Sequence, residues 1–171
     1  MNPVKIDLVW LMHVQKPARY IGGEWNSIVK NHDSVDVKVA LAFPDVYEVA
    51  MSHLGLKIIY SVINSKSYAL AERVYAPWID MEKMMRERGI PLFSLENKCP
   101  IHDFDVLGFT IPYEMSYTNV LNMIDLAKIP VLSKDRSDND PIVISGGPCV
   151  YNAEPMCDFI DAVSYTHLTL P

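Results

Sequence analysis

Apolar runs alternate with amphipathic stretches along most of the chain. Residues 35–43, VDVKVALAF, begin with alternating apolar and polar positions and end in a continuous apolar run. This pattern is typical of a strand that enters a buried sheet. Further strands are predicted at 72–77, 90–96, 104–112 and 142–148, and a last strand begins within DFIDAV at 158–163.

Helical spacing follows most of these strands. After Ser52, a candidate N-cap, the apolar residues Leu54, Ile58, Val62 and Ile63 recur at the period of a helix. Two more helices are predicted at 78–89, ended by Gly89, and at 113–129. Strands that alternate with helices of about 10 to 15 residues indicate parallel βαβ units. The predicted fold class is α/β, a flavodoxin-like (Rossmann-like) doubly wound parallel sheet.

Three segments are predicted in the chain. Residues 1–34 form a short amphipathic helix and an arm, and residues 35–162 form the α/β domain. The final stretch 163–171, VSYTHLTLP, does not continue the preceding pattern and resembles a translated sequencing adapter. We therefore expect a non-native tail at 163–171 and a sheet that is truncated near its last strand.

The composition of the chain disfavours some classes of binding partner and favours one cellular compartment. The 171 residues are 50% hydrophobic and carry a formal charge of -6, which disfavours binding to a nucleic-acid backbone. Apolar runs stay short of the roughly 20 residues that cross a membrane, so no membrane partner is expected. Three cysteines in no framework spacing favour the cytoplasm. Cys149 and Cys157 lack the spacing of a metal or iron-sulfur site and are interpreted as buried thiols.

The strand at 142–148 ends on Gly146 and Gly147. In an open parallel sheet, ligands bind beyond the carboxyl ends of the strands. Glycine at that edge lacks a Cβ and tolerates positive φ, so a flat or bulky ligand can approach the backbone closely. A tight turn explains the same pair without any ligand.

Two other loops are expected at this edge. Asp45 and His53 follow the first strand, and at this position both would contact a cofactor. The alternative is that the Asp45 carboxylate caps a helix and that the His53 imidazole lies near solvent. Tyr113 and Ser116 follow the strand at 104–112, and their aromatic face and hydroxyl would line a pocket or belong to the core. Dinucleotide, P-loop and nucleophile-elbow motifs are absent from the sequence, so no catalytic residue is predicted.

Five ordered blocks carry a family resemblance between residues 15 and 162: QKPARYIGGEWNSIVK, VALAFPDVYEVAMSHLGLKIIYSVIN, ERVYAPWIDMEKMMRERGIPLFSLE, GFTIPYEMSYTNVLNMIDLA and ISGGPCVYNAEPMCDFIDA. Together they resemble the N-terminal region of bacterial radical S-adenosylmethionine (SAM) proteins that carry a cobalamin-binding-like domain. The resemblance implies a flavodoxin-like domain followed by a partial TIM-like barrel. In that barrel a C-x-x-x-C-x-x-C loop holds a [4Fe-4S] cluster and S-adenosylmethionine.

The resemblance also implies roles for individual residues. Thr110 and its neighbours would face the cofactor, and Gly146 and Gly147 would let the corrin or its nucleotide tail lie against the backbone. Asp45 and His53 depart from the D-x-H-x-x-G spacing of a cobalt-ligating domain. Two alternatives follow: cobalamin binds without a histidine on cobalt, or the domain keeps the fold without the cofactor.

Two functions are therefore expected from the sequence. In the first, the chain is the cofactor-handling domain of a radical SAM enzyme, and the downstream barrel, missing from this chain, is its partner and holds the catalytic cluster. In the second, it is a non-catalytic Rossmann-like interaction module, in which VYAPWIDMEKMM and the methionines, nine in the whole chain, form a docking face.

Overall fold

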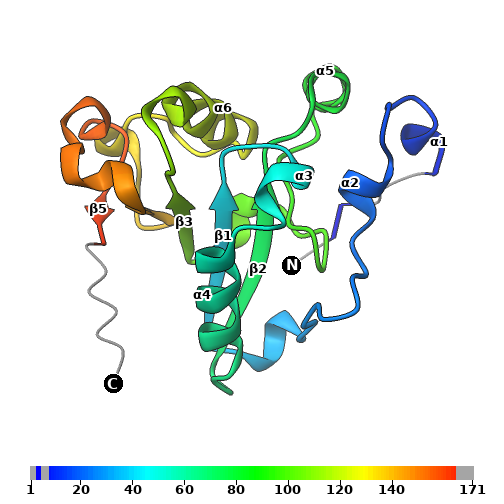
Figure 1. Ribbon diagram of the computed structural model, residues 1–171, viewed down its shortest axis with the longest axis horizontal. Helices are drawn as coiled ribbons and strands as arrows, with labels where there is room; N and C mark the ends of the chain where they lie inside the picture. Colours follow the sequence, from blue (N-terminus) through cyan, green and yellow to red (C-terminus); the bar gives the residue numbers. More distant parts are fainter. Residues whose placement is uncertain (1–2, 5–7, 165–171) are drawn as a thin grey trace.

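The computed structural model describes residues 3–4 and 8–164. Its centre is an all-parallel five-stranded sheet in the order β2-β1-β3-β4-β5 (Figure 1). This is the strand order of flavodoxin-like folds, so the predicted fold class is confirmed. The strands are β1 (Val37–Phe43), β2 (Ala69–Tyr75), β3 (Val106–Thr110), β4 (Ile142–Gly146) and β5 (Ala162–Val163).

Three helices of ten or eleven residues connect the first four strands. They are α4 (Leu54–Asn64), α5 (Ile79–Arg88) and α6 (Tyr117–Leu126). Gly89 ends α5 in the left-handed conformation, as predicted. The shorter helices are α1 (Leu8–Leu11), α2 (Ala18–Ile21), α3 (Tyr47–Ala50) and the 3-10 turns η1 (His32–Ser34), η2 (Ile101–Asp103), η3 (Glu114–Ser116), η4 (Ser133–Asp135), η5 (Pro148–Asn152) and η6 (Glu154–Met156).

Two local predictions were wrong. His53, rather than Ser52, is the N-cap of α4. The segment 90–96 is not a strand of the sheet, because its backbone bonds run to separate elements: Leu92 N–H donates to the Leu126 carbonyl, and Leu95 N–H donates to that of Arg73. Apolar content alone therefore did not distinguish a strand from a buried connection.

The two faces of the sheet are covered unequally. On one face, Ala40 and Ala42 of β1 pack in the larger core with side chains of α5 and α6. On the other, Leu41 and Phe43 pack with α4 in a smaller cluster. Figure 1 shows α4 beside β1 and β2, with no helix of similar length over β3 to β5 on that side.

The methionines of α5 belong to the larger core. Met81, Met84 and Met85 are all buried there. The docking face predicted for 74–85 in the interaction-module hypothesis is therefore wrong for these three residues. Because they fill the space between α5 and the sheet, they stabilise the fold.

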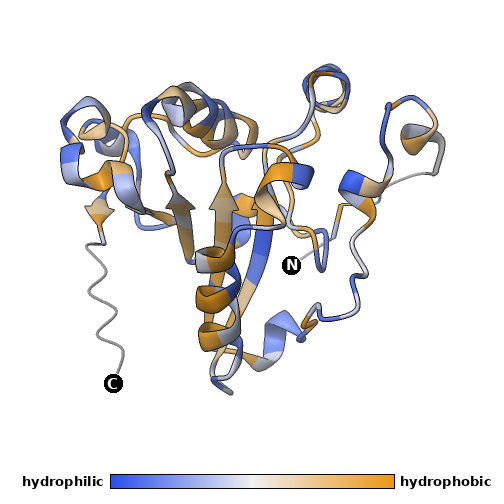
Figure 2. Ribbon diagram, in the orientation of Figure 1, coloured by the Kyte–Doolittle hydropathy of each residue, from blue (hydrophilic) through white to orange (hydrophobic). Residues whose placement is uncertain are grey.

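Helix α4 is only partly buried. Leu56 and Tyr60 pack on the sheet, and Ile63 is half-buried. By contrast, Leu54, Ile58 and Val62, whose spacing predicted the helix, are 69%, 40% and 55% exposed. Figure 2 colours much of α4 and of the neighbouring strands as hydrophobic.

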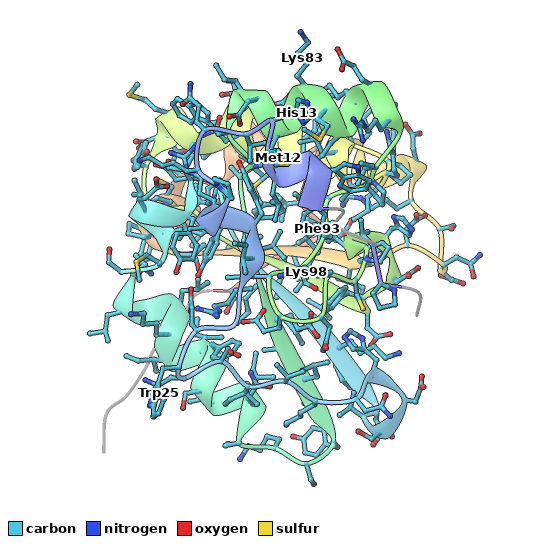
Figure 3. All side chains as sticks on the ribbon, turned by 90° about the vertical axis from the view of Figure 1, so that its right-hand side faces the viewer. Met12, His13, Trp25, Lys83, Phe93 and Lys98 are labelled. Carbon is cyan, nitrogen blue, oxygen red and sulfur yellow. The ribbon has the colours of Figure 1, made fainter. Side chains whose placement is uncertain are left out.

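The free edge of β2 is covered by polar groups and by the N-terminal arm (Figure 3). The Asn64 side chain bonds both the N–H and the C=O of Ala71, and Lys30 Nζ donates to the Ala69 carbonyl. Glu96 accepts from the N–H of Arg73 at 2.7 Å. Since an uncovered edge strand invites pairing with other chains, these bonds protect the sheet at this side.

The three cysteines differ in burial. Cys99 and Cys149 are buried, whereas Cys157 is exposed, so the prediction of a buried thiol is wrong for Cys157.

The predicted tail begins with Val163, a residue of β5 that pairs with Ser145 of β4. Residues 165–171 lie outside the described residues. Among the described residues, none of the helices has the length and apolar character to cross a membrane.

Candidate functional site

A hollow of about 470 Å³ lies on the α4 side of the sheet. Its floor is made by alternate residues of three adjacent strands, and its wall by one side of α4. Asp, Glu, Lys and Arg are absent from its described lining. The floor includes Val39, Leu41, Val106, Thr110 and Ile144, and the wall includes His53, Gly55, Ile59 and Ile63.

Four of the seven predicted site residues line this hollow. They are His53, Thr110, Gly146 and Gly147, and they come from three segments far apart in the sequence. They meet because the carboxyl ends of parallel strands lie at one edge of the sheet. The structure therefore brings together these four predicted residues.

Glycines deepen the hollow. A Cβ built on Gly108 would lie 3.6 Å from Ile144 Cγ1, and one on Gly146 would lie 3.7 Å from the Ser164 carbonyl oxygen. Both are ordinary contact distances, so the backbone there does not demand glycine. Gly55 and Gly108 were not predicted as site residues. Gly108 lies inside the apolar strand pattern at 104–112, and a glycine there is a signal of close approach.

Gly147 has a structural reason to be glycine. Its φ is 100°, and a Cβ would lie 2.8 Å from the Ile111 carbonyl oxygen. The Ile111 N–H donates to the Gly146 carbonyl at 2.8 Å, which holds the ends of β3 and β4 together. The tight-turn explanation thus accounts for Gly147, while Gly146 remains the glycine that shapes the hollow.

His53 caps α4 at the rim of the hollow. Its Nδ1 accepts from the Leu56 N–H at 3.1 Å, and its ring lies 5.0 Å from that of Phe43. A neutral imidazole whose Nδ1 accepts carries its proton on Nε2. In this arrangement neither ring nitrogen offers a lone pair to a metal.

Asp45 and Tyr113 meet outside the hollow. Asp45 Oδ1 accepts from the Val46 N–H, and Oδ2 accepts from the Tyr113 hydroxyl at 3.1 Å. This hydrogen bond raises the pKa of Tyr113. Ser116 is buried, and its hydroxyl donates to the Tyr113 carbonyl. These residues link the loops after β1 and β3 and do not line the hollow.

Comparison with known proteins identifies the family. The family described as "Radical SAM proteins, N-terminal" matches residues 55–166, more than half of the chain. The chain belongs to this family. An uncharacterized protein of Methanocaldococcus jannaschii is 25% identical over 126 residues, which make up 72% of this chain and 22% of that protein. No solved structure matches the chain.

The match to radical SAM N-terminal domains covers most of the hollow. It runs from Gly55, at the start of α4, through β5, and so includes Thr110, Gly146 and Gly147. Asp45 and His53 precede it. Within the described residues, His, Cys, Asp and Glu side chains form no group of three that could hold a metal ion. The described lining of the hollow is mostly apolar.

Proposed function

We propose that this chain is the cofactor-handling N-terminal domain of a radical SAM protein and that its hollow receives the nucleotide tail of cobalamin. The observation that carries the proposal is the convergence of His53, Thr110 and Gly146 on one hollow whose described lining has no Asp, Glu, Lys or Arg. Membership of the radical SAM N-terminal family supports it.

The polarity of the lining and the space beside α4 support the binding of such a tail. The nucleotide base is flat and aromatic, and the missing Cβ atoms of Gly108 and Gly146 leave depth for it between the strands and α4. Thr110 is one of the few polar residues of the described lining, with His53, Ser145 and Ser164, and a few well-placed polar groups are enough to orient a bound ring.

The described lining of the hollow supports a mode of binding without a protein ligand on cobalt. His53 Nδ1 is held by the α4 backbone, and Asp45 bonds Val46 and Tyr113 rather than the imidazole. The domain would therefore hold cobalamin with no histidine on cobalt. When bound, cobalamin supplies a methyl carrier or an electron partner. The cleavage of S-adenosylmethionine at a [4Fe-4S] cluster would belong to a downstream barrel.

Titration with hydroxocobalamin tests this function. We expect the absorption bands of the corrin to shift when the protein is added. Gly108→Val fills the floor with a residue that strands accept, and it should abolish the shift. The control Ile142→Leu changes an exposed side chain outside the hollow and should leave the shift intact. Bands that stay unchanged with the wild-type protein would overturn the proposal.

A module without cofactor is the second candidate, and the exposed apolar residues of α4 favour it. In that case the hollow and α4 serve only to bind protein. The same titration separates the two functions, because a docking module leaves the cobalamin spectrum unchanged.

A further inference from the structure

A second cavity, of about 360 Å³, lies between the N-terminal arm and α4. Trp25 and Ile28 of the arm line one side, Lys57 and Ser61 of α4 line the other, and Arg73 of β2 also lines it. We call this space the arm cavity. It shares none of its described lining residues with the hollow, so the two spaces can hold different ligands at the same time.

Hydrogen bonds around the arm cavity fix the arm to the rest of the domain. The Tyr60 hydroxyl accepts from the Ile28 N–H at 2.7 Å and donates to the Ile28 carbonyl at 3.2 Å. The Glu24 carboxylate accepts from the Tyr47 hydroxyl with one oxygen and from Arg73 with the other. The walls are therefore held by the protein itself, and a preformed cavity spares a ligand the entropic cost of ordering them.

Trp25 stands at the rim of the arm cavity. It is 98% exposed, and Figure 3 shows it beside α4 at the outer edge of the molecule. Aromatic side chains stabilise a fold mainly through the area that they bury, so this indole adds little to the packing of the domain. Both faces of its ring are open to a flat partner, and a nucleobase that stacks on an aromatic side chain is such a partner.

The polar side chains on the walls are mostly free donors. Lys57 presents an ammonium with three N–H groups and forms no ion pair within the described parts of the chain. The side chains of Asn26 and Ser61 likewise have no hydrogen bond to another described residue. Both oxygens of the Glu24 carboxylate are already hydrogen-bonded. The arm cavity therefore favours an anionic group that is rich in hydrogen-bond acceptors.

The charges around the arm cavity leave Lys57 as the cation for such an anion. Arg73 lies between two carboxylates, because its Nε is 2.6 Å from Glu96 Oε1 and its Nη1 bonds Glu24. A phosphate monoester offers three terminal oxygens and a charge of about -1.5 to -2 at neutral pH, more than a carboxylate does. Phosphate therefore satisfies more of the free donors on these walls.

We propose that the arm cavity binds a nucleoside monophosphate, with the base stacked on Trp25 and the phosphate on the Lys57 ammonium. The volume of about 360 Å³ falls within the range of about 300–1,000 Å³ that is usual for small-molecule sites. Ile28 and Met51 supply an apolar part of the lining, against which the edge of the base packs. This site depends neither on the hollow nor on cobalamin.

Isothermal titration calorimetry with adenosine monophosphate tests the proposal. We expect it to bind at least about tenfold more tightly than adenosine, which lacks the charge, or inorganic phosphate, which lacks the ring. Trp25→Ala should weaken its binding at least about fivefold, because the stacking surface is lost. Since Trp25 is 98% exposed, this variant should keep the midpoint of thermal unfolding within about 2 °C of the wild type.

Lys57→Met provides the second arm of the test. It should weaken the binding of adenosine monophosphate at least about fivefold and leave the binding of adenosine unchanged, because only the phosphate loses its partner. Tyr68→Ala and Lys66→Met are matched controls, since both replace exposed residues outside the arm cavity. They should leave the Kd for adenosine monophosphate within about twofold of the wild-type value.

Three results would each overturn the proposal. They are no binding of adenosine monophosphate at about 5 mM, equal affinities for adenosine monophosphate and adenosine, and a Trp25→Ala variant that binds as tightly as the wild type. Gly108→Val fills the hollow and should leave the binding of adenosine monophosphate unchanged. A failure of cobalamin to bind is thereby distinguished from a failure of this site.

Discussion

The imidazole Nδ1 of His53 accepts a hydrogen bond from the backbone N–H of Leu56, across the first turn of α4. An imidazole thus fills the place that Ser, Thr, Asp or Asn usually takes at a helix N-terminus. The bond orients the ring at the rim of the hollow and commits one ring nitrogen to the backbone. His53 is accordingly a structural residue of the site.

Replacing His53 tests this role. We expect His53→Ala to lower the free energy of unfolding by about 1 kcal/mol, because the Leu56 N–H loses its acceptor. His53→Asn keeps an acceptor and should remain close to the wild type. Urea denaturation measures both variants. Equal stability of His53→Ala and the wild type would contradict the capping role.

The neighbouring glycines Gly146 and Gly147 should respond differently to alanine. Gly147→Ala forces a Cβ to 2.8 Å from the Ile111 carbonyl oxygen at positive φ, so we expect a loss of about 1–3 kcal/mol. Gly146→Ala meets its nearest atom at 3.7 Å and should cost less than about 1 kcal/mol. Denaturant midpoints of the two variants check the difference, and equal losses would refute it.

Arg73 ties the N-terminal arm to the β2 edge. Its Nε lies 2.6 Å from Glu96 Oε1, its Nη1 bonds Glu24 of the arm, and its guanidinium lies 5.1 Å from the Tyr60 ring centroid. Both Arg73 and the Glu96 side chain are buried. Burial, the largest influence on Glu96, raises its pKa, while Arg73 opposes that rise.

Removing the Arg73 guanidinium should lower the free energy of unfolding substantially. Arg73→Met leaves the Glu96 carboxylate buried without its partner, and we expect a loss of about 3–5 kcal/mol in the free energy of unfolding. The control Lys83→Met breaks an exposed pair with Glu87 and should cost less than about 0.5 kcal/mol. Chemical denaturation compares the two. A loss with Arg73→Met as small as that of the control would show that the network does not hold the arm.

Glu48 gives a prediction for acid pH. Hydrogen bonds from Arg19 and Lys16 lower the pKa of Glu48 from 4.5 to about 2. A carboxyl whose pKa is lower in the folded state contributes stability above its unfolded pKa. That contribution is lost as the pH falls from 4.5 toward 2. Because Glu48 is partly exposed, the contribution should be below about 1 kcal/mol.

The substitution Glu48→Gln isolates this contribution. The variant should be slightly less stable than the wild type at neutral pH, and the difference should vanish near pH 2. Thermal unfolding at a series of pH values measures it, with Glu87→Gln on α5 as an exposed control. A difference that persists unchanged at the acid end would contradict the prediction.

Some elements of this fold can be predicted from the sequence because they depend on residues that are neighbours in the chain. The apolar run at 35–43 and Gly89 after the helix at 78–89 depend only on neighbouring residues, and both predictions held. The segment 90–96 carries a similar apolar signal, yet its partners are the Leu126 and Arg73 carbonyls. Those partners are distant in the chain, so a local pattern could not identify them.

The residues of the candidate site also differ in how well the sequence predicted their positions. Strand direction alone predicted that His53 and Gly146 lie at the carboxyl edge of the sheet, because it brings those loops together. Thr110 was expected there from the family resemblance. The sequence did not separate Asp45, Tyr113 and Ser116 from the hollow, since their positions depend on which hydrogen-bond partner each side chain finds.

The sequence by itself determined the parallel α/β architecture, because alternating strand and helix periods leave few other ways to bury the apolar residues. Only the tertiary structure decided which apolar residues are buried. Leu54 and Leu56 stand two positions apart on one helix, yet the first is exposed and the second packs on the sheet. Their chemistry is identical. About 200° separates them around the helix axis, and the packing of α4 on β1 and β2 places the side of Leu56, not that of Leu54, against the sheet.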